Sequence, residues 1–305
     1  MRFGKIPGLA KPVSKLILGS VYFHCDQQAE ADAVLDRFLE KGGNTIDTAH
    51  CYGENASVPL GNWMKSRGNR NEVVILDKGC HPYGSPRMTA TDLLSDLETD
   101  LQRLGTDHVD IWMFHRDDPS ADLSALLNCL HDEINRGRIA AIGGSNWTPD
   151  RLEEANRIAE NEGLTRLTIS SPNLCLADAN EPMWDGCVAL DQAGREWHAQ
   201  TQMPVFAWSS VARGFFAGFE DDDVRRVFHN PANFARLDRT IELACKLGVK
   251  PVQVALAWTL DQPFPVHALI GCRTPEEVDD AVEAFYISLT REQHAWLREG
   301  KPGAQ

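Results

Sequence analysis

The fold is decided by the stretch Asn44-Thr45-Ile46-Asp47-Thr48-Ala49-His50-Cys51-Tyr52-Gly53. It begins with a short apolar-alternating run, which predicts a strand over residues 45–47, and continues as a polar loop that ends at Gly53. Asp47 therefore closes the strand, and Tyr52 follows in the loop. In a parallel barrel, active-site residues lie at this end of the strands, so the stretch indicates function as well as fold.

Two later strands are expected to end in the same way. Residues 73–77 run into Lys78, and residues 109–114 run into His115. Because the C-terminal ends of parallel barrel strands meet on one face, we expect these side chains to converge with those that follow the first stretch.

Strand-like and helix-like patterns alternate along the rest of the chain. The expected strands are residues 15–19, 45–47, 73–77, 109–114, 139–143, 167–170, 205–208 and 267–270. The expected helices are residues 27–41, 56–66, 91–104, 123–136, 149–162, 185–200, 233–247, 252–260, 275–285 and 291–298. Eight alternations without a linker predict one α/β domain over residues 1–305, a parallel (β/α)8 TIM barrel.

Two segments are expected to lie outside the barrel repeat. Residues 1–14 are rich in glycine and proline and predict an N-terminal hairpin cap, and residues 209–231 predict a long irregular loop after strand seven. The structural alternative is a doubly wound sheet, which would carry Gly-x-Gly-x-x-Gly after the first strand. Residues 19–23 lack that pattern, which favours the barrel.

Composition excludes several classes of partner. The formal net charge is -14 and the pI about 5.1, which disfavours nucleic acids and anionic membranes as partners. We expect no membrane span and no signal peptide, because no apolar run is long enough. The eight cysteines form no Cys-x-x-Cys pair and no zinc-finger spacing, which predicts a reduced cytoplasmic protein without a metal site.

The candidate site combines Asp47, Tyr52, Lys78 and His115. A tyrosine hydroxyl alone is a weak acid, and we expect a neighbouring ammonium to lower its pKa. Asp47 would pair with the lysine, and a neutral histidine would polarise a carbonyl oxygen. Such a set suits protonation of an oxygen that becomes negative as hydride arrives at carbon.

The same stretch resembles the Asp-Thr-Ala-x-x-Tyr-Gly signature of the aldo-keto reductase superfamily. Residues 104–115, 137–146 and 252–258 are similar to further segments of that family, in the same order along the chain. The resemblance implies an NAD(P)H-dependent oxidoreductase on a (β/α)8 barrel, with Tyr52 as the general acid. It would reduce an aldehyde, ketone or sugar carbonyl.

The resemblance also implies which residues bind the cofactor, and the aromatic and charged residues near the strand ends predict the substrate contacts. The nicotinamide would contact Ser145, Asn146, Asn173 and Trp208. The pyrophosphate would lie against Ser209, Ser210, Ala212, Arg213 and Gly214. The adenosine end would meet Gly271, Cys272, Arg273, Thr274, Glu277 and Asp280. The substrate would contact Tyr22, Phe23, Trp112, Arg116 and Trp147.

Two positions depart from the family pattern in ways that concern the chemistry. Asp77 precedes Lys78 and would either compete with Asp47 for the lysine or point away from the site. Glu277 would repel a 2′-phosphate if it faced the cofactor, whereas Arg273 would attract one. We therefore expect NADP(H) to be favoured and NAD(H) to be possible.

Two other functions stay open at the level of sequence. A phosphate-binding barrel, such as an isomerase or aldolase, would use the loops after strands seven and eight. A redox-sensing regulatory subunit of the same superfamily would retain its cofactor and turn over slowly. The sequence does not determine the oligomeric state.

Overall fold

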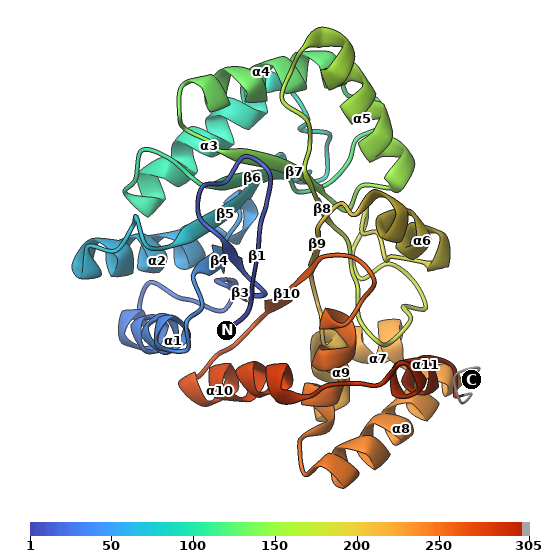
Figure 1. The fold of residues 1–305 in the computed structure, drawn as a ribbon. Coiled ribbons are helices and arrows are strands. Elements are labelled where there is room, and N and C mark those ends of the chain that lie inside the picture. The colour runs from blue at the N-terminus through green and yellow to red at the C-terminus, as the bar shows by residue number, and fades with distance from the viewer. Residues whose placement is uncertain (301–305) are drawn as a thin grey trace.

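The computed structural model, which describes residues 1–300, is a closed barrel of eight parallel strands surrounded by helices (Figure 1). The strand order around the barrel is β10-β3-β4-β5-β6-β7-β8-β9. The strands are β3 (Leu16–Gly19), β4 (Thr45–Asp47), β5 (Val74–Gly79), β6 (Ile111–Phe114), β7 (Ala141–Ser145), β8 (Ile169–Ser171), β9 (Val205–Ala207) and β10 (Val266–Ile270). The predicted (β/α)8 fold is confirmed.

The longer helices follow the strands in turn, as the alternating pattern predicts. They are α1 (Gln28–Glu40), α2 (Glu54–Arg67), α3 (Ala90–Leu104), α4 (Leu123–Asn135), α5 (Pro149–Glu162), α6 (Gln192–Thr201), α7 (Asp222–Phe228), α8 (Pro231–Leu247), α9 (Pro251–Leu260), α10 (Pro275–Glu283) and α11 (Arg291–Glu299). Local chemistry fixes several of their ends. The side chain of Thr148, for example, caps α5 with Pro149 in its first turn, and Gly163 ends the helix in the left-handed region.

Several predicted boundaries are wrong. The helix expected from residue 185 begins only at Gln192, because Asp191 accepts the capping hydrogen bond from the Gly194 backbone. The segment 209–231, expected to be irregular, contains the short 3-10 turn η2 (Ala212–Ala217) as well as α7, whose cap is Asp221. Short capped turns such as these give too little periodicity to be predicted from sequence.

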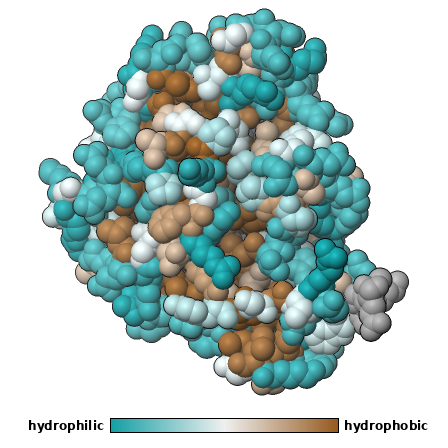
Figure 2. All heavy atoms as spheres, viewed as in Figure 1, coloured by the Kyte–Doolittle hydropathy of each residue, from teal (hydrophilic) through white to brown (hydrophobic). Residues whose placement is uncertain are grey.

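The strands divide their side chains between two cores. Residues such as Val74, Leu76 and Met113 fill the barrel interior, whereas Ile75 and Trp112 belong to the core between barrel and helices. This alternation with period two decides which residues near a strand end face the site. In the view of Figure 2, hydrophilic side chains dominate the surface and hydrophobic ones show in smaller patches.

The predicted N-terminal hairpin is present and covers the N-terminal end of the barrel. Strands β1 (Phe3–Gly4) and β2 (Val13–Ser14) pair antiparallel and cross in front of the barrel in Figure 1. The ring of His267, on β10, is fully buried beneath them and lies 3.0 Å from the carbonyl oxygen of Ser14. Burial and the neighbouring charge of Lys15 lower the pKa of His267 to about 3.

This buried imidazole should make folding sensitive to acid. Between about pH 6.5 and pH 3 the unfolded chain binds a proton at His267 that the folded chain does not, so the free energy of unfolding falls as pH falls. His267→Gln should remove about 2 kcal/mol of the loss between pH 7.5 and pH 5. Urea unfolding at several pH values measures this, with the exposed His24→Gln as control. Equal acid sensitivity in both variants would contradict the prediction.

Candidate active site

A large pocket opens at the C-terminal ends of the barrel strands. Its volume is about 2160 Å³, and it is lined by the ends of several strands and by the loops that follow β8, β9 and β10. Pockets for single small molecules measure roughly 300–1,000 Å³. The space therefore suits two ligands side by side. Asp47, Tyr52, Lys78 and His115 all line it, as the convergence of strand ends requires.

A buried ion pair forms the floor of the pocket. Lys78 and Asp47 are 3% and 2% exposed, and the lysine Nζ donates a hydrogen bond to the Asp47 carboxylate. The same Nζ donates to the carbonyl oxygen of Thr48 at 2.7 Å. Burial lowers the pKa of Lys78, but the charge of Asp47 outweighs it and the net pKa is raised. The lysine is therefore a fixed positive charge at neutral pH.

Tyr52 is placed beside this charge by the 3-10 turn η1 (His50–Tyr52), which directly follows β4 and the linking residues 48–49. The Lys78 Nζ lies 5.1 Å from the centroid of the tyrosine ring. The Lys78 ammonium lowers the pKa of Tyr52, as expected, but burial raises it more strongly, so the net pKa is raised. Tyr52 therefore keeps its proton at neutral pH and is a donor.

His115 completes the set from the end of β6. It is 6% exposed, and its ring meets that of Tyr52 edge to face at a centroid distance of 5.8 Å. Burial, together with the charges of Lys78 and Arg116, holds the pKa of His115 well below its usual value. The imidazole is therefore neutral at physiological pH and can donate a hydrogen bond without carrying charge.

Asp77 points away from the site. It precedes Lys78 on β5, so the alternation of the strand directs it toward the helix layer, where it is fully buried. Within residues 1–300 neither of its carboxylate oxygens has a hydrogen-bond partner. Burial and the nearby charge of Asp100 raise the pKa of Asp77 well above its ordinary value. Because the Asp77 carboxyl group lies on the far face of the strand, it does not compete with Asp47 for Lys78.

The residues expected around the nicotinamide form a hydrogen-bonded set at the ends of β7, β8 and β9. Asn146 donates to the carbonyl oxygen of His115 and accepts from the indole of Trp208 at 3.1 Å. Ser145 and Trp208 line the pocket, whereas Asn173 lies behind its wall and donates to the Trp208 carbonyl. Asn146 therefore orients the tryptophan and has its amide groups already engaged with protein atoms.

The loop after β9 carries unusual backbone conformations at the pocket wall. Ser209, Ala212 and Arg213 all have positive φ, as does Gly214. Successive residues with such conformations turn backbone N–H groups toward a common point, which is how proteins build anion-binding concavities. Arg213 also pairs with Asp221 at 3.1 Å. Ser210 lines the pocket, whereas Ala212 is buried behind it.

The residues after β10 divide between the pocket and the helix that follows. Most of those expected at the adenosine end line the pocket, namely Gly271, Cys272, Arg273, Glu277 and Asp280. Thr274 instead caps α10. The Arg273 guanidinium lies 4.4 Å from the centroid of the Tyr22 ring, and its backbone N–H donates to Glu277 at 2.7 Å. Glu277 therefore faces the same pocket.

Three of the expected substrate contacts do not reach the pocket. Tyr22 and Arg116 line it, but Phe23, Trp112 and Trp147 are buried in the core between barrel and helices. Trp112 occupies an outward position on β6, and Trp147 stacks on Phe114 at 5.2 Å. The expectation that these three side chains contact the substrate is therefore wrong.

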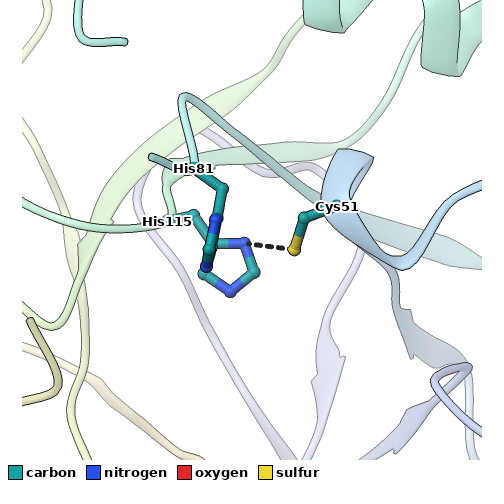
Figure 3. Close-up of side chains that lie close together, drawn as sticks. All are labelled: Cys51, His81 and His115. Atoms are coloured by element: carbon teal, nitrogen blue, oxygen red, sulfur yellow. Dashed lines mark hydrogen bonds between the residues drawn. The ribbon is translucent and has the colours of Figure 1, made fainter. Parts of the chain in front are cut away.

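Other residues that line the pocket were not predicted. Residues 181–187 form one wall, and Trp184 stacks on Trp208 at a centroid distance of 6.2 Å. The expected helix over residues 185–200 concealed this loop. Cys51 and His81 also line the pocket, next to His115 (Figure 3). Their positions in loops after two predicted strand ends were the available signal.

A closed parallel barrel with ionisable side chains gathered at its C-terminal strand ends defines the class of (β/α)8 barrel enzymes. The model of the aldo/keto reductase family matches residues 15–300. The chain therefore belongs to the aldo/keto reductase family, and the resemblance seen in the sequence is confirmed.

Three relatives illustrate the range of the similarity. The uncharacterized oxidoreductase YrpG of Bacillus subtilis is 28% identical, over 95% of this chain and 93% of its own length. Norsolorinic acid reductase stcV of Emericella nidulans is 26% identical, over 92% of this chain and 76% of its own length. A putative voltage-gated potassium channel subunit beta of Schizosaccharomyces pombe is 27% identical, over 85% and 80%.

The buried ion pair gives a stability prediction. Asp47→Asn leaves the Lys78 ammonium buried without its anionic partner, so the free energy of unfolding should fall by about 3 kcal/mol or more. Asp117→Asn is the matched control, because the pair between Asp117 and Arg151 is more accessible to water and its loss should cost about 1 kcal/mol. Chemical denaturation of both variants measures the two changes in the free energy of unfolding. A loss of about 1 kcal/mol or less in Asp47→Asn would contradict a stabilising role for the buried pair.

Proposed function

We propose that the protein reduces an aldehyde, ketone or sugar carbonyl to an alcohol, with a nicotinamide cofactor as hydride donor and Tyr52 as general acid. One observation carries the proposal: a proton-bearing Tyr52 stands between a charged Lys78 and a neutral His115 inside the pocket. Family membership and relatives named as oxidoreductases support it.

Each side chain has a distinct part in the proposed reaction. Tyr52 and His115 both donate hydrogen bonds to the carbonyl oxygen and so polarise the bond. As negative charge grows on that oxygen, Tyr52 transfers its proton. Lys78 stabilises the phenolate that remains, and Asp47 holds the ammonium in position. The raised pKa of Tyr52 keeps the proton available until the oxygen becomes basic.

The pocket has features that fit an NAD(P)H cofactor, whose part is to supply the hydride. Trp208 offers an aromatic ring held by Asn146, and the left-handed backbone of residues 212–214 suits a pyrophosphate. Arg273 has no carboxylate partner for its guanidinium within residues 1–300, which suits a 2′-phosphate. Glu277 would oppose that phosphate. We propose NADP(H) as the favoured cofactor, with NAD(H) also used.

The remaining volume and the pocket wall bear on the substrate. Tyr22, Tyr83 and Trp184 bring aromatic surface, and Arg116 brings a cation beside His115. Such a mixture suits a carbonyl compound with both ring and hydroxyl groups. A relative is named norsolorinic acid reductase, which is compatible with reduction of an organic substrate. The eight unpaired cysteines support the expected cytoplasmic location. No helix of residues 1–300 has the length and apolar character required to cross a membrane.

The similarity to a putative potassium channel subunit beta favours a second candidate, a regulatory subunit that binds the cofactor. Multiple-turnover oxidation of NADPH by a panel of aldehydes, ketones and sugars separates the two. Sustained turnover supports the enzyme. One turnover followed by retention of the oxidised cofactor supports the regulatory subunit.

The role of Tyr52 has a direct test. Tyr52→Phe removes only the hydroxyl and should lower kcat by about 10² or more, the usual scale for a general acid, while cofactor affinity persists. Tyr286→Phe is the matched control, because that ring is 78% exposed and lies outside the pocket. Wild-type turnover in Tyr52→Phe would remove the tyrosine from the mechanism.

Cofactor choice has a separate test. Arg273→Ala should raise KM for NADPH by about tenfold and change KM for NADH much less. The reason is that only NADPH carries the 2′-phosphate that the Arg273 guanidinium would bind. Arg225→Ala, an exposed arginine outside the pocket, is the control for a general change in surface charge. If the ratio of the two KM values stays the same in Arg273→Ala, this arginine does not select the cofactor.

A further inference from the structure

Three side chains with nitrogen and sulfur donors meet at the wall of the pocket (Figure 3). Cys51 comes from the η1 turn, His81 from the loop after β5, and His115 from the end of β6. One possible ligand atom from each residue lies within 4.8 Å of the other two. The Cys51 Sγ is 3.4 Å from Nδ1 of His115, and the two imidazole rings stand nearly perpendicular at a centroid distance of 4.9 Å.

The second observation concerns His81. Its Nδ1 atom is buried and has no hydrogen-bond partner among the described residues. An orphaned ring nitrogen loses its hydration without compensation, so a ligand that accepts its lone pair would stabilise the arrangement. The proposed reaction gives this nitrogen no part.

We propose that Cys51, His81 and His115 form a binding site for a divalent cation of the zinc type. One thiolate and two imidazoles are ligands that Zn²⁺ and Co²⁺ prefer, whereas Mg²⁺ and Ca²⁺ require oxygen. Tetrahedral zinc separates a sulfur from a nitrogen ligand by about 3.6 Å. The distance of 3.4 Å between Cys51 Sγ and His115 Nδ1 is close to this value, and a possible ligand atom of the partly exposed His81 lies within 4.8 Å of both.

The three residues would leave one coordination position of the metal open. All three residues line the pocket, so a fourth position of the metal faces the space where a substrate or water would lie. Binding forms one metal–sulfur and two metal–nitrogen bonds and releases the thiol proton of Cys51 to solvent. Lys78 and Arg116 are nearby cations, and their charge disfavours a bound metal ion. The affinity for the metal must therefore come from the bonds to sulfur and nitrogen.

Occupancy of the site would inhibit the enzyme, a consequence that rests on the proposed function. The metal would hold the His115 ring and bring positive charge close to Tyr52 and Lys78. The cation and its fourth ligand would also occupy space at the pocket wall, beside the position expected for the carbonyl group. Zinc should therefore act as a reversible inhibitor that competes with the carbonyl substrate, and a chelator should restore turnover.

Metal binding is tested without turnover, by titrating the whole protein with Co²⁺. A 1:1 complex should show the thiolate-to-cobalt charge-transfer band and the intense visible bands of tetrahedral cobalt, and Zn²⁺ should displace it. Cys51→Ser should abolish the charge-transfer band, and His81→Gln should weaken binding by about tenfold or more. Cys187→Ser is the matched control, since that thiol also lines the pocket but lies outside the cluster, and its spectrum should stay unchanged.

The activity measurement separates this inference from the proposed function. Zn²⁺ should inhibit Cys51→Ser and His81→Gln less than the wild type, each compared with its own metal-free rate. A spectrum without the thiolate band, or one unchanged in Cys51→Ser, overturns the metal site. If the cobalt complex forms but no carbonyl is reduced under any condition, the metal site stands and the proposed function fails.

Discussion

The structure depends on one desolvated ion pair, between Lys78 and Asp47. Neither charge can remain in the barrel without the other, because a lone buried ion costs several kcal/mol. The pair therefore constrains the register of β4 and β5, where Asp47 lies opposite Leu76 and the lysine follows two residues later. With that register set, the turn after β4 brings Tyr52 over the ammonium. The same ion pair therefore neutralises a buried charge and positions the ammonium beside Tyr52.

Burial also separates the protonation states of groups that touch one another. It favours the neutral forms of Tyr52 and His115, whereas the charge of Asp47 preserves that of Lys78. Lys78 thus stays charged at neutral pH beside two neutral donors, Tyr52 and His115. Outside the barrel wall, the same effect raises the pKa of Asp77 well above its ordinary value. The two adjacent residues Asp77 and Lys78 therefore lie in different electrostatic environments, because their side chains face opposite cores.

The strand ends were predictable because parallel barrel geometry converts order along the chain into convergence in space. That rule alone was enough to predict that Lys78 and His115 lie at the pocket. Trp112 lies close to a strand end, but the alternation of β6 directs its side chain outward, away from the pocket. The wall formed by residues 181–187 lacks periodicity and was hidden by an expected helix. The cluster of Cys51, His81 and His115 joins three separate loops, and no spacing in the sequence encodes such a contact.

The wall of residues 181–187 has a consequence for how this protein diversifies. It has no regular secondary structure and follows in the chain the strands that end near Asp47, Lys78 and His115. It contributes Trp184 to the pocket without contributing to the barrel ladder. Substitutions there can reshape the cavity while the hydrogen-bonded frame of the barrel and the contact between Tyr52 and Lys78 stay fixed. The shape of the pocket can therefore evolve separately from the residues at its floor.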